Sequence, residues 1–437
     1  MLAEARLTRK ASLRRRAGDR KHEPPMSTEE IKRVIIIGAG QGGGETAQRL
    51  RQNGFTGDIT LIGEEPVAPY QRPPLSKAYL KGEIDMDRLL LRPASVYSEE
   101  RIALLTGTRA VWIDRANKRV RVEGGRELAY DALVLATGAK PRRLSLVGAD
   151  LPGVHLIRTA ADIDGLREVV KSGARMVVIG AGYIGLEVAA VARQKGLDVT
   201  VVETAVRPLA RVTSPEVAGF FLDEHTRQGV RFVLGGQPAV IKGADRVTGV
   251  GLADGVELPA DIVISGIGIA PEAALAQQCG LTVENGIVTD RQCRTSDPSI
   301  FAIGDCASRP LVHYDNRMAR LESVHNAVEG AKIVAATLMG KTHQEEAPWF
   351  WSDQYDLKLQ IAGLFQGYDQ IVFRGVMADR AFAAFYYKAG KLIAVDAVNK
   401  PGEYLGAKML IQTNRTVAPS AIEDMSRPMK EIVAAAR

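Results

Sequence analysis

Glycine recurs at one spacing in two short segments of this chain, and that spacing can bring a polypeptide backbone against a phosphate. The first segment runs from Gly38 to Gly43 and the second from Gly180 to Gly185. In each, the first glycine permits a tight turn, the second leaves room for a diphosphate, and the third lets a helix pack closely on a strand. The N-terminal amides of that helix then hold the negative charge. A single match is weak, but two matches predict two dinucleotide sites.

The chain around each copy supplies the elements that such a phosphate site needs. An apolar run that predicts a buried parallel strand precedes each copy, at residues 34–37 and 176–179, and an alanine-rich helical stretch follows it. Beyond each helix a second apolar strand leads to an acidic residue, Glu64 or Glu203. A carboxylate at that place can accept hydrogen bonds from an adenosine ribose.

The likeness between the two regions continues along the chain. Residues 131–138 form an apolar run that ends in Ala-Thr-Gly, and residues 261–268 repeat its pattern. Both regions therefore look like complete nucleotide-binding units. We expect an α/β protein with two Rossmann-like domains.

Breaks in composition divide the chain into domains. A Lys-Pro-Arg-Arg stretch ends the first unit, and Pro271 follows the second. The apolar run before Gly304-Asp305 could complete the first unit's sheet, in which case the second domain is inserted into the first. We expect a basic tail at 1–29, a first dinucleotide-binding domain at 30–140 and 269–340, a second at 141–268, and a C-terminal domain at 341–437.

The C-terminal region has a different pattern. From Pro348 onward, short alternating or aromatic runs are separated by glycine turns, which predicts an antiparallel sheet. Residues 404–413 and 428–436 look helical and would cover one face of that sheet. We expect an α+β domain here.

The excess of positive charge lies in the N-terminal tail. The net charge is +6, but residues 1–25 alone hold eight Lys and Arg against three Asp and Glu. The rest of the chain carries only +1, which argues against nucleic-acid binding by the folded part. The tail has no apolar run long enough for a signal peptide or a membrane span. We expect it to be disordered, with targeting or anion binding as alternatives and Met26 as an alternative start of translation.

Cysteine and histidine are sparse. Cys279, Cys293 and Cys306 are too few and too scattered for a disulfide framework, which fits a reducing, cytoplasmic location. The six histidines show no ligand spacing, so no protein metal site is indicated.

Two dinucleotide sites on one chain predict a redox pair. A tightly held flavin can accept the hydride that a diffusible nicotinamide delivers, and it can return the electrons singly. The protein's contribution is to place the two rings together and to exclude water.

Several motifs together resemble a known family. They are the first glycine segment, Pro-Pro-Leu-Ser-Lys at 73–77, Ala-Thr-Gly at 136–138, Gly-Ala-Gly-Tyr-Ile-Gly-Leu-Glu at 180–187, Gly304-Asp305, and Pro-Trp-Phe-Trp-Ser-Asp-Gln at 348–354. From Val34 to its end the chain resembles the oxygenase-coupled, NADH-dependent ferredoxin reductases. The resemblance implies a glutathione-reductase-like flavoprotein with FAD in the first domain and NADH in the second. It also implies electron delivery to a [2Fe-2S] ferredoxin that serves a cytochrome P450 or a ring-hydroxylating oxygenase.

The same resemblance assigns cofactor contacts residue by residue. For FAD it implies Gly38, Gly40, Gly42 and Gly43 at the diphosphate, Glu64 at the ribose, Lys77 beside the flavin, Ala110 near the adenine, Asp305 on the ribitol, and Arg72, Thr137, Gly138, Arg158 and Val324 along the cofactor. For NADH it implies Gly180, Gly182, Tyr183, Ile184, Gly185, Glu187, Glu203 and Arg211.

Three residues are candidates for catalysis. The resemblance places Lys77 and Glu187 near the flavin's reactive edge, where a buried charge needs a partner, so we predict an ion pair between them. Without the resemblance, the favoured interpretation is that Lys77 is a surface lysine and Glu187 a solvated helix residue. Trp351 would shield the flavin or line the route to the partner, although paired tryptophans are also common in a domain-interface core.

The nicotinamide donor is expected to be NADH. A carboxylate at Glu203 that bonds a ribose 2′-hydroxyl repels the 2′-phosphate of NADPH. Arg207 and Arg211 follow the same strand and could in principle accept that phosphate.

Two features concern the partner side of the molecule. His325 stands near the expected ring end of the flavin, where an imidazole could affect redox properties or partner contact, or could be a satisfied polar residue. We expect an acidic ferredoxin to dock through a rim that includes Arg72, Arg320 and Lys408, since positive patches steer small acidic carriers.

Rival functions differ in the chemistry they require. A disulfide reductase or a thiol-dependent peroxidase needs a cysteine near the flavin in the first domain, and none precedes Cys279. A rubredoxin-type reductase would differ chiefly in its acceptor surface. A flavoprotein like apoptosis-inducing factor, with a nucleic-acid or protein-binding role, has only the basic tail in its support.

Overall fold

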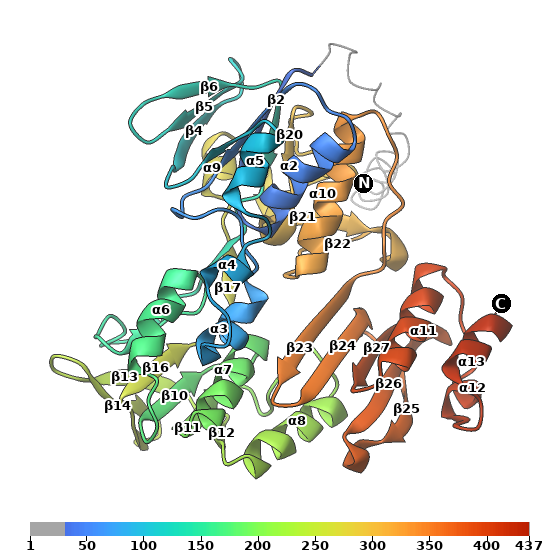
Figure 1. Ribbon diagram of the computed structural model, residues 1–437. Helices are drawn as coiled ribbons and strands as arrows, with labels where there is room; N and C mark the ends of the chain where they lie inside the picture. The colour runs from blue at the N-terminus through green and yellow to red at the C-terminus, as the bar shows by residue number, and fades with distance from the viewer. Residues whose placement is uncertain (1–30, 437) are drawn as a thin grey trace, which may run out of the picture.

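The computed structural model describes residues 31–436 as three lobes, with the first Rossmann-like unit at the top, the second at the lower left and the C-terminal unit at the lower right of Figure 1. The predicted tail at 1–29 lies outside the described residues. We propose the expected boundaries as the division of the chain: a first lobe of 31–140 and 269–340, a second lobe of 141–268, and a C-terminal lobe of 341–436. Among the described residues, no helix combines the length and apolar character needed to cross a membrane.

A parallel sheet in the order β20-β7-β1-β2-β3 forms the centre of the first lobe. Its strands are β1 (Arg33–Ile37), β2 (Asp58–Ile62), β3 (Ile102–Leu105), β7 (Ala132–Leu135) and β20 (Ile300–Ala302). Val34 and Ile36 share one core with helices α2 (Gln41–Gln52) and α10 (Val324–Leu338). Ile35 and Ile37 pack on the opposite side, against β4 (Ala110–Asp114) and β5 (Arg119–Val122). Both faces are covered, which explains why β1 is apolar throughout.

The second lobe repeats this topology. Its parallel sheet has the order β12-β11-β10-β16-β9. The strands are β9 (Val154–His155), β10 (Arg175–Ile179), β11 (Asp198–Glu203), β12 (Arg231–Leu234) and β16 (Ile262–Ser265), and the helices are α6 (Ala160–Val169), α7 (Tyr183–Gln194) and α8 (Pro215–Arg227). In both lobes a three-stranded antiparallel meander comes before the last strand that pairs with the first one. In the first lobe β4, β5 and β6 (Glu127–Ala129) precede β7. In the second lobe β13 (Pro238–Gly243), β14 (Val247–Leu252) and β15 (Glu257–Pro259) precede β16.

The repeat extends to individual ion pairs. Asp131, just before β7, accepts the backbone N–H of Arg33 at 2.8 Å and pairs with its guanidinium at 2.7 Å. Asp261, just before β16, binds Arg175 in the same way at 2.9 and 2.6 Å. The two lobes are therefore copies of one nucleotide-binding unit in their fold.

Two short strands carry the chain between the lobes. β8 (Ala139–Pro141) leaves the first lobe, and β17 (Ile269–Pro271) returns to it and pairs antiparallel with β8. β20 then pairs with β7, which confirms the expected closing strand of the first sheet. The second lobe is thus inserted into the first.

The first lobe's part of the chain also holds short elements, some of which pack against the second lobe. They are η1 (Pro73–Ser76), α3 (Ala78–Lys81), α4 (Met86–Leu89), α5 (Ala94–Glu99), α9 (Ala274–Gln278), β18 (Val283–Glu284), β19 (Gly286–Val288), η2 (Gly304–Cys306), β21 (Ala307–Leu311), η3 (Val312–Tyr314) and β22 (Arg317–Ala319). Of these, η2 carries Asp305 of the predicted site, and η1 is flanked by Arg72 and Lys77.

The C-terminal lobe is an antiparallel sheet in the order β23-β24-β27-β26-β25. Its strands are β23 (Trp349–Gln354), β24 (Leu357–Gly363), β25 (Gln370–Val376), β26 (Ala381–Lys388) and β27 (Lys391–Val398), with η4 (Met377–Asp379) between β25 and β26. Helices α11 (Pro401–Gln412), α12 (Pro419–Glu423) and α13 (Met429–Ala435) cover one face, which confirms that prediction. The other face shares a core with α7 and α8 of the second lobe, so the sheet joins two parts of the molecule (Figure 1).

Candidate functional site

The first glycine segment forms a closed turn with one open position. A Cβ on Gly38 would lie 2.1 Å from the Ala136 carbonyl oxygen, and a Cβ on Gly43 would lie 1.9 Å from the carbonyl oxygen of Gly38. Gly38 also has a φ of 110°, which a side chain would oppose. A Cβ on Gly40 would meet nothing within 4 Å. Only the middle glycine therefore faces open space, as a residue beside a diphosphate must.

The second segment has the same geometry. A Cβ on Gly180 would lie 2.5 Å from the Gly266 carbonyl oxygen, and a Cβ on Gly185 would lie 2.2 Å from that of Gly180, whereas Gly182 faces open space. Ile184 in the first turn of α7 is 44% exposed, which is unusual for a large apolar residue at that place. Both segments fit a dinucleotide diphosphate.

Gly42 has a different setting from the other glycines of the first segment. Its Cβ would meet the side chains of Ile303 at 3.2 Å and Ala327 at 3.7 Å. The missing side chain lets α2 pack against β20 and α10. The predicted diphosphate contact of Gly42 stays a proposal.

The acidic residues near the ends of β2 and β11, Glu64 and Glu203, do not occupy equivalent positions in the two lobes. Ile62 pairs with Ile37 and Val202 pairs with Ile179, so Glu203 is the first residue after this pair, whereas Glu64 is the second residue after the equivalent pair. Glu203 accepts the backbone N–H groups of Ala181 at 2.8 Å and Ala205 at 2.9 Å. Glu64 is exposed, with Arg109 at 3.9 Å. The sequence pattern predicted equivalent positions for the two carboxylates, but the strand register places them at different positions relative to the first strand.

A charged cluster lies where the first lobe meets the second. The Arg158 guanidinium is 3.2 Å from the Asp305 carboxylate. Arg72 donates to the Arg158 carbonyl oxygen at 2.5 Å and pairs with Glu65 at 2.5 Å. Burial and the neighbouring Arg72 lower the pKa of Arg158, while Asp305 opposes that shift. The predicted FAD contacts Arg72, Arg158 and Asp305 are therefore assembled in one place.

The remaining FAD candidates come from other elements of the first lobe. A Cβ on Gly138 would lie 3.1 Å from the Arg158 guanidinium. Thr137 donates its hydroxyl to the Glu272 carbonyl oxygen at 2.5 Å. Val324 begins α10, whose Asn326 side chain donates to the Gly304 carbonyl oxygen at 3.3 Å. Ala110 is buried in β4.

Lys77 and Glu187 form the predicted ion pair, with Lys77 Nζ 2.6 Å from Glu187 Oε2. Glu187 is buried on α7 and also accepts the hydroxyls of Ser76 at 2.5 Å and Ser352 at 2.6 Å. Ser76 comes from the first lobe and Ser352 from β23. All three lobes therefore meet at one carboxylate. Sequence reasoning gave neither serine a role, although each lies within a motif that carries the family resemblance.

Trp351 belongs to an aromatic group on β23. Its ring centroid lies 5.5 Å from that of Trp349, which lies 5.3 Å from the His325 ring. Burial lowers the pKa of His325 to about 4, so the imidazole is neutral at physiological pH. Lys408 Nζ lies 5.2 Å from the centre of the Trp349 ring, in a cation–π contact.

One group of described residues, His325, Glu329 and Glu346, has ligand atoms close enough to hold a metal ion. The ammonium group of Lys332 lies 3.4 Å from Glu329 and 2.8 Å from Glu346. Lys408 Nζ lies 3.2 Å from Glu346. The chain thus compensates these carboxylates with its own cations, and we assign no metal to the group.

The two arginines that follow β11 differ in their surroundings. Arg207 donates to the carbonyl oxygens of Ala210 at 3.0 Å and Thr213 at 3.1 Å, so its guanidinium holds a loop together. Arg211 is exposed, and its guanidinium lies 3.6 Å from the position of a Cβ on Gly268. Tyr183 lies under the same loop and its hydroxyl is 3.4 Å from the Val212 carbonyl oxygen.

The three residues of the expected docking rim differ in exposure and in their partners within the chain, and the rim stays a prediction. Arg320 has a side chain only 9% exposed, which pairs with Glu322 at 2.6 Å and donates to the Asp305 carbonyl oxygen at 3.1 Å. In this structure its guanidinium is held by partners within the first lobe. Arg72 is engaged with Glu65 and Arg158, as described above. Lys408 remains as a partly exposed cation beside Trp349.

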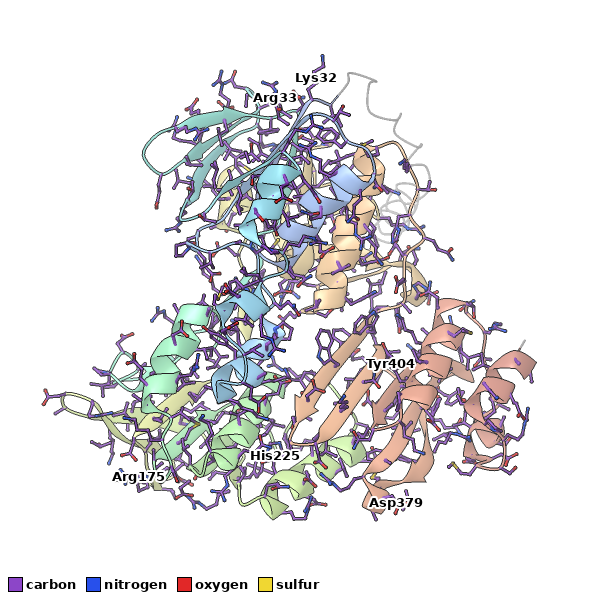
Figure 2. All side chains as sticks on the ribbon, viewed as in Figure 1. Lys32, Arg33, Arg175, His225, Asp379 and Tyr404 are labelled. Atoms are coloured by element: carbon purple, nitrogen blue, oxygen red, sulfur yellow. The ribbon has the colours of Figure 1, made fainter. Side chains whose placement is uncertain are left out.

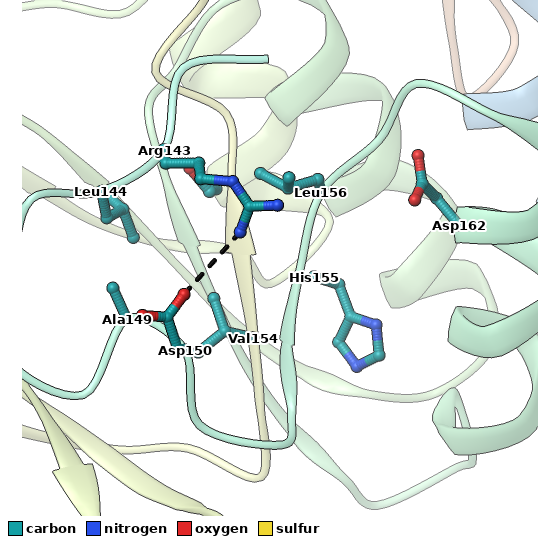
Figure 3. Close-up of a pocket in the computed structure, with 9 residues that line it drawn as sticks. Arg143, Leu144, Ala149, Asp150, Val154, His155, Leu156 and Asp162 are labelled. Atoms are coloured by element: carbon teal, nitrogen blue, oxygen red, sulfur yellow. Dashed lines mark ion pairs between the residues drawn. The ribbon is translucent and has the colours of Figure 1, made fainter. Parts of the chain in front are cut away.

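A pocket on the second lobe is lined by other residues, one of which, Asp162, accepts the backbone N–H of Arg158 at 3.1 Å. Figure 3 shows it between β9 and the preceding segment, where Arg143 and Asp150 face each other at 3.7 Å. Both side chains of that pair are largely exposed, so the contact contributes little. None of the predicted cofactor residues lines this pocket.

Comparison with known proteins finds reductases that are similar to this chain over most of its length. Residues 32–331 match the family model described as pyridine nucleotide-disulphide oxidoreductase, and residues 349–433 match the one described as Reductase C-terminal. A rhodocoxin reductase of Rhodococcus erythropolis is 46% identical over 403 residues, which cover 92% of this chain and 94% of the relative. A rubredoxin–NAD(+) reductase of Pseudomonas putida is 42% identical over 370 residues, covering 84% of this chain and 96% of the relative. The crystal structure of a covalent putidaredoxin reductase–putidaredoxin complex matches with a TM-score of 0.91 and 43% identity, covering 93% of this chain and 99% of that chain.

Proposed function

Because this chain belongs to the pyridine nucleotide-disulphide oxidoreductase family, as a ferredoxin reductase of the putidaredoxin reductase type that uses FAD and NAD(H), we propose that it reduces a [2Fe-2S] ferredoxin with NADH. That ferredoxin would in turn serve a cytochrome P450 or a ring-hydroxylating oxygenase. One NADH and two oxidised ferredoxins give NAD+, two reduced ferredoxins and a proton.

The observation that carries the proposal is the meeting of three lobes at Glu187. Each nucleotide-binding lobe has its own glycine segment, and the Lys77–Glu187 pair links the first lobe to the helix that follows the second segment. A bound FAD supplies the exchange between two-electron and one-electron transfer. Lys77 would supply a positive charge beside the flavin, and Glu187 would offer a carboxylate to the nicotinamide amide.

The first lobe fits FAD through its own residues. Gly40 leaves the space that a diphosphate needs, and the N-terminus of α2 faces that space. Asp305 offers a carboxylate to a sugar hydroxyl, while Arg158 limits its freedom of movement. Trp351 would cover the flavin from β23 and exclude water.

NADH is favoured over NADPH by the residues around β11. The carboxylate of Glu203 is held at the second glycine segment, where it repels a 2′-phosphate. Arg207 is bonded to carbonyl oxygens of its own loop, so only Arg211 remains exposed near the expected ribose. We propose cytoplasmic location as well, which the free thiols of Cys279, Cys293 and Cys306 support.

The acceptor class is tested by anaerobic stopped-flow reduction. We expect the purified protein to contain FAD, to be reduced far faster by NADH than by NADPH, and to reduce [2Fe-2S] ferredoxins faster than rubredoxins. Faster transfer to rubredoxin would make the protein a rubredoxin reductase. A protein without flavin, or one that NADH does not reduce, would contradict the whole proposal.

The proposed ferredoxin is acidic, and Lys408 is the residue whose position supports this. Its ammonium group lies over Trp349, next to the expected flavin edge. We predict that Lys408→Glu lowers the rate of ferredoxin reduction roughly tenfold at low ionic strength, because it weakens electrostatic steering. Reduction of ferricyanide by NADH should not change.

Lys118→Glu on the distant β4–β5 hairpin serves as the matched charge control. Equal losses in both variants would show that net charge, and not a docking site, determines the rate. An unchanged rate for Lys408→Glu would move the docking site elsewhere.

A further inference from the structure

A chain of buried side chains leads away from Glu187 between the second lobe and the C-terminal sheet. Gln354 Nε2 donates to Ser352 Oγ at 3.1 Å, and His225 Nε2 lies 2.7 Å from Gln354 Oε1. The Tyr355 hydroxyl lies 3.2 Å from His225 Nδ1. Figure 2 shows His225 beside the lower end of β23, below the nucleotide-binding segments. Ser352, Gln354 and His225 are fully buried.

The hydrogen bonds of this chain have one consistent direction. A carboxylate only accepts, so Ser352 must donate its hydroxyl hydrogen to Glu187. The Ser352 oxygen then accepts from the Gln354 amide nitrogen, which turns the amide oxygen towards His225. His225 therefore carries its hydrogen on Nε2 and accepts the Tyr355 hydroxyl hydrogen at Nδ1.

The charge state of His225 agrees with this direction. Burial lowers the pKa of His225 to about 4, against a smaller opposite effect of Gln354 and Glu224. The imidazole is thus neutral at physiological pH and has one donor and one acceptor nitrogen. A doubly protonated ring could not accept from Tyr355.

The Glu187 carboxylate needs this support because its other contacts act on one oxygen. Lys77 and Ser76 both bind Oε2, whereas Ser352 alone binds Oε1. Ser352 is itself held by Gln354, and Gln354 by His225 on α8. The chain begins and ends in the second lobe but passes through β23, so the C-terminal sheet determines how the carboxylate is turned.

We propose that Ser352, Gln354 and His225 are positioning residues that fix the Glu187 carboxylate for the nicotinamide end of NADH. This inference rests on the proposed role of Glu187. A purely structural polar chain would contribute to stability alone, so the test must read out nucleotide binding and the histidine tautomer.

The decisive variant is Gln354→Glu, which keeps the shape of the side chain and reverses one hydrogen bond. A carboxylate at position 354 cannot donate to Ser352, and it competes with Glu187 for the Ser352 hydroxyl. We expect the dissociation constant of NAD+, measured by calorimetry, to rise roughly tenfold, because a hydrogen bond to a charged group is lost. We expect the FAD content to stay at the wild-type level.

The histidine tautomer gives a readout that does not depend on activity. In the wild type, the ¹⁵N shifts of His225, identified by comparison with His225→Gln, should show an Nε2-protonated neutral ring. In Gln354→Glu the ring should become doubly protonated at neutral pH. Gln354→Met removes the amide without adding charge, and it should weaken NAD+ binding while leaving His225 neutral.

Asp353→Asn is the matched control, since Asp353 is the neighbour on β23 and its side chain points to the opposite face of the sheet. It should bind NAD+ as the wild type does. Wild-type NAD+ affinity in both Gln354 variants, or an Nδ1-protonated His225 in the wild type, would overturn the inference. Failure of wild-type protein to oxidise NADH would instead contradict the proposed function and leave the tautomer result standing.

Discussion

At the scale of single residues, this protein buries charges at the contacts between its lobes. Glu187 has three donors, and its charge is compensated by Lys77. Among residues 31–436, Asp396 on β27 has no cation in its hydrogen-bonding contacts: its Oδ2 accepts the hydroxyls of Tyr386 and Thr213, and its Oδ1 has no partner there. Thr213 belongs to the second lobe. Both carboxylates therefore join the C-terminal sheet to the second lobe. A lysine compensates the charge of Glu187, whereas only hydroxyl groups bind Asp396.

Asp396 should make stability depend on pH. Burial raises the pKa of Asp396 to about 6, and the hydroxyls of Thr213 and Tyr386 oppose this only in part. Because the pKa is higher in the folded than in the unfolded protein, folding is favoured below pH 4 and this contribution is lost as the pH rises to about 6. The loss is on the order of 3 kcal/mol. Tyr183 is also close enough to be affected by this charge.

The variant Asp396→Asn separates this effect from general pH sensitivity. Its free energy of unfolding, measured with urea at pH 4 and pH 7, should improve relative to the wild type as the pH rises. The difference between the two pH values is the relevant quantity, since any packing change from the amide is the same at both. A difference that does not vary with pH would show that Asp396 stays protonated or is solvated.

At the scale of elements, the strand–glycine–helix unit is what the two nucleotide-binding lobes share. In both lobes the third glycine touches the carbonyl oxygen of the first, so the helix lies directly on the turn. This contact cannot adjust because it joins backbone to backbone.

A methyl group at either third glycine should remove one cofactor selectively. A Cβ would lie 1.9 Å from the Gly38 oxygen in Gly43→Ala and 2.2 Å from the Gly180 oxygen in Gly185→Ala. We expect Gly43→Ala to purify with little FAD. We expect Gly185→Ala to keep FAD but to show a KM for NADH at least tenfold higher. An increase of that size corresponds to the loss of about one hydrogen bond to a charged group.

Gly219→Ala in α8 is the control, because a Cβ there meets nothing within 4 Å. It should retain both cofactors and gain up to about 1 kcal/mol from helix propensity. Loss of both cofactors in either third-glycine variant would indicate that the lobes do not bind them independently.

At the scale of the whole molecule, the C-terminal sheet packs on two different partners. On β26, Phe382 faces the second lobe and forms an edge-to-face contact with Phe220 of α8 at 4.9 Å. Phe385 faces the opposite way, into the core with α11 and α13. Both are fully buried, so they differ in the partner they contact and not in their exposure.

Truncation of these two rings should destabilise different parts of the protein. Each of Phe382→Ala and Phe385→Ala should cost about 3–5 kcal/mol. In hydrogen exchange, Phe382→Ala should increase exchange in α8, whereas Phe385→Ala should increase it in α11 and α13. The same pattern in both variants would mean that the sheet and its two partners unfold as one unit.

The sequence alone determined the parts of this protein that depend on local patterns. Glycine spacing, apolar strand runs and their repetition predicted two nucleotide-binding units, and the closing strand before Gly304 predicted that one is inserted into the other. The motifs around Lys77 and Glu187 led to the correct ion pair through the family resemblance. Turns, strand periodicity and helix starts are set by neighbouring residues, which is why a sequence carries them.

Only the tertiary structure decided which distant side chains share a contact. Ser76 and Ser352 reach Glu187 across 111 and 165 positions of the chain. The Arg320 side chain is largely buried and pairs with Glu322, and Glu64 does not occupy the position equivalent to Glu203. These outcomes depend on how the three lobes pack and on strand register. No local sequence pattern within a lobe predicts lobe packing or strand register, because the free energy of such contacts arises only when separate surfaces come together.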